Sequence, residues 1–267
     1  MRSADIKFSQ RSAEPGGIIS GVVLVETDKT FECNRVILKV KGKERTEIGS
    51  GDSKIADEHY HIKGKIELSE GLPPTYSGYN GWIEYSVEAV VEMDWTIDPK
   101  ITRRFRVIPF QPAYIPEPDG YDPINKDKDI LHVELLSNIL RMKEGISVRF
   151  MGEEHSRVNG VRLELRRRET VRCQRRESTH DVTIKEKFIP ITFREFDRWR
   201  EETIGEGWRH IPFQSKLIET FYFLKVTLEM RWELDPFVRF RLKISGEKLK
   251  EDVEDLFADF AFDLGFN

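Results

Sequence analysis

Two histidines separated by one residue are the strongest candidates for metal chemistry in the chain. His59 and His61 share one face if this segment is a strand, because strand side chains alternate. With Asp57 or Glu58 they could ligate zinc. The other histidines are scattered and no further cluster has ligand spacing, so we expect solvent-facing strand residues and no metal site.

Residues of the types used in nucleophilic catalysis are present, but none stands in a catalytic motif. No G-x-S-x-G elbow surrounds a serine, and no P-loop or G-x-G-x-x-G pattern indicates a nucleotide site. Arginines flank Cys173 and would lower its thiol pKa, but its apolar neighbours Val171 and Leu165 indicate burial. We predict a protein without enzymatic activity, catalytic residues or cofactors.

A run of arginines between residues 162 and 176 is the first candidate for partner binding. Four of them share one face of a predicted strand: Arg162, Arg166, Arg168 and Arg172. Guanidinium groups suit phosphate or carboxylate, so this face could bind an acidic or phosphorylated tail or an anionic lipid head. The alternative, which we favour, is a solvated face paired with Glu164, Glu169 and Glu177 or with acidic residues on the neighbouring strand. No aromatic platform interleaves with the arginines, so we expect no nucleic-acid partner.

The last residues, 247–267, form the second candidate for partner binding. Apolar side chains recur there at helical spacing, opposite an acidic face: Leu249, Val253, Leu256, Phe257, Phe260 and Leu264. Such an acidic amphipathic helix is a poor binder of anionic membrane, and its apolar stripe must bury against protein. It could dock on this chain or a second subunit, which we favour, or on a separate partner.

Strand signals dominate the elements that would position these residues. Alternating apolar and polar residues occur in segments such as 36–42, 62–68, 83–91, 130–135, 161–165 and 221–244, with glycine and proline between them. This period-2 pattern indicates antiparallel sheets with one wet face and one buried face. Five prolines between residues 109 and 123 cannot join a central sheet, so we interpret this region as a linker.

Composition places the protein in the soluble, intracellular class. The net charge is −4 with 34% charged residues, which gives no general attraction to nucleic acid or anionic membrane. The two cysteines, Cys33 and Cys173, do not form a disulfide framework and fit a reducing compartment. No segment has the apolar core of a signal peptide or the length of a transmembrane span. We therefore expect a cytoplasmic protein.

An internal repeat is the most informative pattern in the sequence. The string E-M-D-W-T-I-D-P at 92–99 returns as E-M-R-W-E-L-D-P at 229–236, a correspondence that we call the repeat register. In this register Tyr85 matches Tyr222 and Trp95 matches Trp232. Asp-Pro is a turn signal inside an alternating pattern, so the repeat predicts one long hairpin used twice. Two copies at so long a spacing favour domain duplication over a solenoid.

These motifs resemble the arrestin superfamily, which includes the visual and β-arrestins, the α-arrestins, Vps26 and the bacterial Spo0M proteins. The similar segments are P-G at 15–16 with S-G-V-V-L-V at 20–25, L-K-V-K-G-K at 38–43, and L-P-P-T-Y-S-G at 72–78 followed by I-E-Y-S-V-E-A-V at 83–90. The resemblance covers residues 5–108 well, and the repeat extends it to 130–245. The charged polar core of the signalling arrestins matches no residues here.

The resemblance implies an all-β fold of two tandem antiparallel β-sandwich domains, immunoglobulin-like and arrestin-type. We place the domains at 1–110 and 130–246, the proline-rich linker at 111–129 and the amphipathic tail helix at 247–267. The implied function is a cytoplasmic, non-enzymatic adaptor or scaffold in trafficking, signalling or sporulation-type regulation. Its partners would be proteins, including cytoplasmic tails of membrane proteins. The alternatives are a self-associating protein without a client, for example a homodimer, and a metal-dependent enzyme using His59 and His61.

Overall fold

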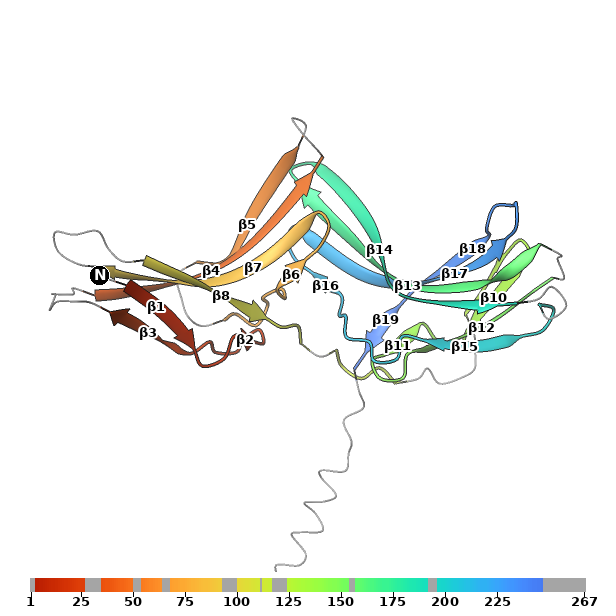
Figure 1. Ribbon diagram of the computed structural model, residues 1–267, viewed down its shortest axis with the longest axis horizontal. Coiled ribbons are helices and arrows are strands. Elements are labelled where there is room, and N and C mark those ends of the chain that lie inside the picture. The colour runs from red at the N-terminus through yellow and green to blue at the C-terminus, as the bar shows by residue number, and fades with distance from the viewer. Residues whose placement is uncertain are drawn as a thin grey trace, which may run out of the picture. The chain divides into compact units, whose positions relative to one another are not determined.

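The structure is a computed structural model that describes residues 3–26, 35–49, 54–63, 68–92, 100–110, 112–116, 124–153, 157–191 and 196–246. All regular secondary structure within these ranges is β-strand, which confirms the all-β class (Figure 1). No helix in the described ranges is long and apolar enough to cross a bilayer. The predicted tail helix at 247–267 lies outside the described residues, as do Cys33 and Trp95.

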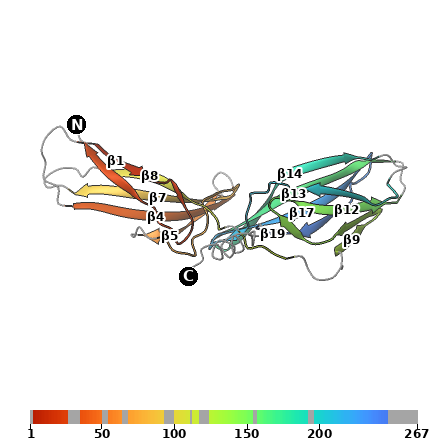
Figure 2. The ribbon, with the colours of Figure 1, turned by 90° about the horizontal axis from the view of Figure 1, so that it is seen from below.

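The N-terminal half contributes eight strands in two sheets. They are β1 (Ser3–Phe8), β2 (Ser12–Ala13), β3 (Gly21–Glu26), β4 (Arg35–Ile48), β5 (Ile55–Lys63), β6 (Tyr76–Ser77), β7 (Gly81–Glu92) and β8 (Lys100–Val107). One sheet has the order β2-β8-β7-β4-β5, with β6 also paired to β7, and β1 pairs with β3 in the other. Figure 2 shows β1 running beside β8, with which it is in contact.

Alternate side chains of these strands build one apolar core. On β7, buried positions recur at every second residue from Gly81 to Val87, as the period-2 pattern predicts. Ile6 of β1 joins the cluster that contains Val40, Tyr85 and Phe105, so the β1–β3 sheet covers the larger sheet. Burial raises the pKa of the Tyr85 phenol, whose hydroxyl donates to the Pro73 carbonyl at 2.6 Å.

The C-terminal half contributes eleven strands. They are β9 (Ile124–Lys128), β10 (Leu131–Leu135), β11 (Ile139–Arg141), β12 (Ile146–Gly152), β13 (Val158–Cys173), β14 (Arg176–Pro190), β15 (Arg200–Ile204), β16 (Phe213–Gln214), β17 (Ile218–Met230), β18 (Phe237–Arg241) and β19 (Lys243–Ser245). Their sheets have the orders β15-β12-β10-β9, β11-β19 and β14-β13-β17-β16, with β18 also on β17. β9 lies within the predicted linker and is polar over most of its length, so alternation gave no sign of it.

The described chain divides into two compact units that do not coincide with the two halves of the sequence. Unit 1 contains residues 1–110, 166–184 and 211–223, and unit 2 contains 111–165, 185–210 and 224–267. Strands β13, β14 and β17 therefore contribute residues to both units. Each unit has its own buried apolar residues, such as Tyr85 and Phe105 in unit 1 and Val133 and Phe150 in unit 2.

Strand pairings in the first half return in the second half in the repeat register. Tyr76 of β6 pairs with Ile83 of β7, and their matches, Phe213 of β16 and Thr220 of β17, pair in the same way. The parallel contact of β2 with β8 returns as the parallel contact of β11 with β19, in which β19 matches β8 in the repeat register while β11 follows β2 by 127 residues. Tyr85 and Tyr222, the matched tyrosines, are both buried.

A second correspondence, which we call the hairpin register, relates the strands at the start of each half. The antiparallel pairing of β1 with β3 has the same register as the pairing of β10 with β12. Adding one constant number to the residue numbers of each pair in β1 and β3 gives a pair in β10 and β12: Ala4 with Val25 becomes Leu131 with Gly152. Ala4, Ile6 and Phe8 of β1 thus hold the positions of Leu131, Val133 and Leu135 of β10. No residue of β1 is identical to its counterpart in β10, so the equivalence of these two strands comes from the pairing registers.

Two buried glutamates of unit 1, Glu169 and Glu44, hold the turns that precede β7 and β17 through hydrogen bonds. Glu169 accepts hydrogen bonds from the Tyr76 hydroxyl at 2.5 Å and from the main-chain N–H groups of Tyr79 and Asn80 at 3.1 and 2.7 Å. A Cβ on Gly78 would stand 1.5 Å from this carboxylate, so the turn requires glycine there.

Glu44 fastens the other turn in the same way. Its carboxylate accepts from the Ser215 hydroxyl and from the Leu217 amide, the latter at 3.1 Å. Leu217 matches Asn80 in the repeat register, so the two glutamates contact equivalent turn positions. Both are 1% exposed or less. Buried carboxylates with several charge-assisted donors are strong local restraints, and we expect each to hold its turn rigidly.

Candidate functional site: a basic groove beside an open strand edge

Three of the four predicted arginines, Arg166, Arg168 and Arg172, belong to unit 1 and already have partners. Arg168 makes a two-pronged ion pair with Asp181, at 2.6 and 2.7 Å. This hydrogen bond raises the pKa of its guanidinium. Arg172 lies 3.6 Å from Glu177, and Arg166 bonds the Asp181 carbonyl at 3.5 Å. These contacts are those of a solvated, cross-strand paired face, and partner binding by these arginines stays a prediction.

The fourth arginine, Arg162, belongs to unit 2. It pairs with Glu229 and, at 3.4 Å, with Glu186. The hydrogen bond to Glu229 raises the pKa of the Arg162 guanidinium. The carboxylate partners of these four arginines are Glu229, Glu186, Asp181, Glu177 and, 3.8 Å from Arg172, Glu219. Glu177 was predicted by name, and the other four lie on β14 and β17, the strands next to β13. Glu169 instead serves the buried turn described above.

The predicted metal and thiol candidates gain no supporting geometry. His59 and His61 lie in β5, but their side chains are outside the described residues. Within the described ranges no three His, Cys, Asp or Glu side chains gather as metal ligands would. Cys173 is buried, and burial raises its thiol pKa, which is the opposite of an activated nucleophile. The six tail residues from Leu249 to Leu264 lie outside the described residues.

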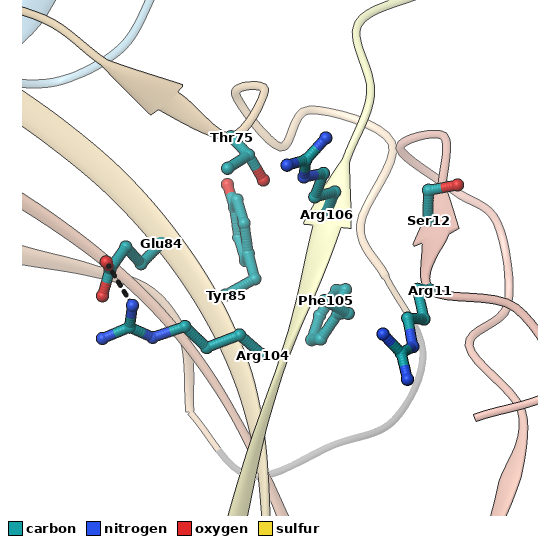
Figure 3. Close-up of a pocket in the computed structure, with 8 residues that line it drawn as sticks. All are labelled: Arg11, Ser12, Thr75, Glu84, Tyr85, Arg104, Phe105 and Arg106. Carbon is teal, nitrogen blue, oxygen red and sulfur yellow. Dashed lines mark ion pairs between the residues drawn. The ribbon is translucent and has the colours of Figure 1, made fainter. Parts of the chain in front are cut away.

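A groove between β1 and β8 in unit 1 is the site that sequence reasoning missed. Its first hollow, of about 600 Å³, is lined by Asp5, Ile6, Lys7, Phe8, Arg11, Arg103 and Arg104. The adjoining hollow, of about 620 Å³, shares Arg11 and Arg104 and continues to Arg106 and Thr75 (Figure 3). The floor is aromatic, with Phe8 and Phe105 in edge contact at 6.3 Å between ring centroids. We call these two hollows together the β1–β8 groove.

The β1–β8 groove is strongly basic. Its charged side chains are five cations and two carboxylates, a net charge of +3: Lys7, Arg11, Arg103, Arg104 and Arg106 against Asp5 and Glu84. Arg103 pairs with Asp5 at 2.6 Å, and Arg104 pairs with Glu84 at 3.3 Å, the contact marked in Figure 3. Lys7, Arg11 and Arg106 have no ion pair with any described residue and are exposed. Three cations therefore remain for an anionic ligand.

The groove runs along a strand edge that is open in the described part of the chain. β1 pairs only with β3 there, whereas β10, its counterpart, pairs with β12 on one side and with β9 on the other. The Ile6 amide donates to the Asp5 carboxylate at 2.8 Å, so a side chain satisfies it instead of a neighbouring strand. That hydrogen bond, more than the ion pair with Arg103, lowers the pKa of Asp5. An unpaired edge is a template for an added strand.

The local sequence gives little indication of this groove. The only signal is the segment T-R-R-F-R-V at 102–107, whose Arg104 and Arg106 share the outer face of β8. Lys7 and Arg11 are distant in the sequence and join it only through the packing of β1 on β8. Comparison of the chain with protein-family models and with curated proteins gives no match.

Proposed function

We propose that the protein is a non-enzymatic adaptor of arrestin type, whose N-terminal half takes up an extended acidic segment of a protein client. The segment adds as an antiparallel strand to the open edge of β1 and lies in the β1–β8 groove. The observation that carries this proposal is β9, which occupies the matching edge of β10 in unit 2. Strand addition draws its affinity from main-chain hydrogen bonds and its specificity from alternate side chains.

The pairing of β9 with β10 predicts which side chains such a client needs. Lys126 of β9 pairs with Val133, and its ammonium lies 5.0 Å over the ring of Phe240. In the repeat register, Arg103 stands at the position of Phe240. The client residue that pairs with Ile6 would occupy the place of Lys126, so its side chain would lie near the Arg103 guanidinium instead of an aromatic ring. A carboxylate suits this position, because the fork of Arg103 has donors left beyond those that hold Asp5.

The neighbouring client position has the opposite requirement. His132 of β10 pairs with Asp127 of β9, through a side-chain contact of 2.8 Å. In the hairpin register Asp5 stands where His132 stands. An acidic client residue opposite Asp5 would meet like charge, so a hydroxyl or cationic residue is expected there. The preferred client therefore alternates acidic with hydroxyl or cationic residues.

The remaining features of the proposal rest on the repeat and on the resemblance. Two copies of one pairing pattern support a duplicated domain, and sheets that bury alternate residues suit two tandem β-sandwiches. The similarity to arrestin-type sequences supports a cytoplasmic adaptor whose clients include tails of membrane proteins. The acidic segment 247–267 of the chain itself is a second candidate ligand for the β1–β8 groove, because its charge is opposite to that of the groove.

A peptide titration tests the proposed function. A fluorescent peptide of alternating glutamate and threonine should bind the full chain, and added salt should weaken the binding, because unpaired cations supply the attraction. The control peptide has lysine in place of each glutamate and should not bind. Equal binding of both peptides, or binding of neither, would contradict the proposal. Removal of residues 247–267 should tighten binding if the tail occupies the groove.

A further inference from the structure

The tip of the β17–β18 hairpin presents two large apolar side chains to solvent. Trp232 is 96% exposed and Leu234 is 95% exposed, the highest values among the exposed large hydrophobic residues of the described chain. Phe237 of β18, a nearby apolar residue, is by comparison 43% exposed. We call residues 231–236 with these two side chains the apolar finger.

The backbone of the apolar finger is fastened on both sides of the exposed residues. The Met230 amide donates to the Asp235 carboxylate at 2.8 Å, and the Arg231 amide donates to the Arg157 carbonyl at 2.8 Å. Trp232 has a φ of +64°, a left-handed conformation that is unfavourable for a bulky side chain. Because the Met230 and Arg231 hydrogen bonds hold this unfavourable backbone conformation, we infer that the Trp232 side chain is kept pointing into solvent.

We propose that the apolar finger inserts into the interfacial layer of an electrically neutral lipid bilayer. The tip offers only two apolar side chains, far less area than the roughly 800 Å² that each partner buries in a specific protein interface. A bilayer needs no matching shape, and tryptophan favours its headgroup boundary, where the ring is buried and the indole N–H stays wet. This inference goes beyond the client site and does not depend on it.

The charges around the finger point to neutral lipid. Glu233 pairs with Arg157, while Arg231 bonds the Asn159 side chain at 2.7 Å and Asp235 is engaged by the Met230 amide. Two cations and two carboxylates thus cancel at the tip. No surplus of positive charge is present among these described residues to attract anionic headgroups, and no surplus of negative charge repels a neutral surface.

The sequence of the apolar finger occurs twice in the chain. Trp95 and Ile97 match Trp232 and Leu234 in the repeat register, within the shared E-M-x-W-x-[IL]-D-P string, and lie outside the described residues. One small apolar anchor gives weak, reversible membrane binding, and a second raises it by effective concentration. Weak, reversible binding through Trp232 and Leu234 fits an adaptor that samples a membrane surface.

Flotation with phosphatidylcholine vesicles tests the proposal on the full chain. The wild type should float with the vesicles, and the Trp232→Ser/Leu234→Ser variant should lose about tenfold or more of its vesicle partition, because the two insertable side chains of the 231–236 finger are removed. Tryptophan emission should shift to the blue on vesicle addition, and this shift should shrink in Trp232→Phe. Trp199→Ala is the matched control: Trp199 is 42% exposed and lies outside the finger, so flotation should be unchanged.

Three outcomes would overturn the inference. The first is a wild type that stays in the dense fraction and never floats, as expected if the finger enters a pocket of a protein. The second is unchanged flotation of the double variant. The third is flotation only with phosphatidylserine vesicles and equally for both proteins, which indicates charge adsorption. Trp232→Gly separates folding from binding, since glycine tolerates the positive φ and should leave the unfolding temperature undiminished.

Discussion

Replacement of Glu169 by glutamine should lower the free energy of unfolding of unit 1 by about 3 kcal/mol. The carboxylate is 1% exposed and accepts from the Tyr76 hydroxyl and two main-chain amides. Glutamine has the same shape, but its amide nitrogen cannot accept, so at least one buried donor loses its partner and the other bonds lose charge assistance. Urea unfolding followed by tryptophan fluorescence measures the loss.

A double-mutant cycle identifies the origin of the loss. Tyr76→Phe removes one of the three donors, and the loss caused by Glu169→Gln should be smaller in its presence, because the two changes share a hydrogen bond. The matched control is Glu177→Gln, an exposed carboxylate 3.6 Å from Arg172, whose effect should stay below about 0.5 kcal/mol. A Glu169→Gln effect as small as that of the control would show that the buried carboxylate does not restrain the turn.

Reversal of two groove charges should weaken binding of the glutamate–threonine peptide by about a hundredfold. The variant is Arg11→Glu/Arg106→Glu. Neither guanidinium has an ion pair within the described chain, so the change costs the fold little. It turns two attractive contacts into two repulsive ones in a groove with a net charge of +3. Fluorescence anisotropy at low and moderate salt measures the dissociation constant.

The control for charge reversal changes the net charge of the protein by the same amount elsewhere. Arg198 and Arg209 are exposed, belong to unit 2 and take part in no ion pair with described residues. Arg198→Glu/Arg209→Glu should change the dissociation constant less than about threefold, through long-range screening alone. An equal loss of affinity in the two variants would mean that the peptide responds to net charge and has no site in the groove.

The sequence predicts the elements well where alternation is strong. The segments around Tyr85, Val133 and Leu163 were expected to be strands, and the structure confirms all three. The expected alternation of burial holds around Tyr85 and Val133, whereas next to Leu163 the polar residue Glu164 is buried as well. The equivalence of Tyr85 and Tyr222 could be predicted because the repeated string at 92–99 and 229–236 lies close to them in the sequence. β9 was missed because a strand at the sheet edge can be polar on both faces and then has no period to detect.

The candidate site could not be predicted, because it depends on pairing across long separations. Lys7 and Arg103 look like ordinary surface residues, and only the packing of β1 on β8 brings them into one groove. The counterpart relation between β1 and β10 has no residue identity behind it and appears only in the register of two hairpins. The arginine run was conspicuous in sequence, yet its members bind carboxylates and carbonyls of their own unit.

Glu44 and Glu169 illustrate a different limit. Each stands in an alternating, charge-rich strand where glutamate indicates solvent, and Glu169 was expected to pair with a neighbouring arginine. In the structure both are buried, because a turn from elsewhere in unit 1 supplies main-chain donors. Burial of a carboxylate is decided by such donors, which the sequence around the residue does not contain.

Hydrogen–deuterium exchange is the most direct measurement of strand addition to β1. With the glutamate–threonine peptide bound, the amides of residues 4–8 should exchange more slowly, and the Ile6 amide above all, since a client carbonyl would replace the Asp5 carboxylate as its acceptor. The amides of residues 131–135, already paired with β9, should exchange as before. Saturating peptide that leaves residues 4–8 unprotected, or that protects a different strand, would contradict the account.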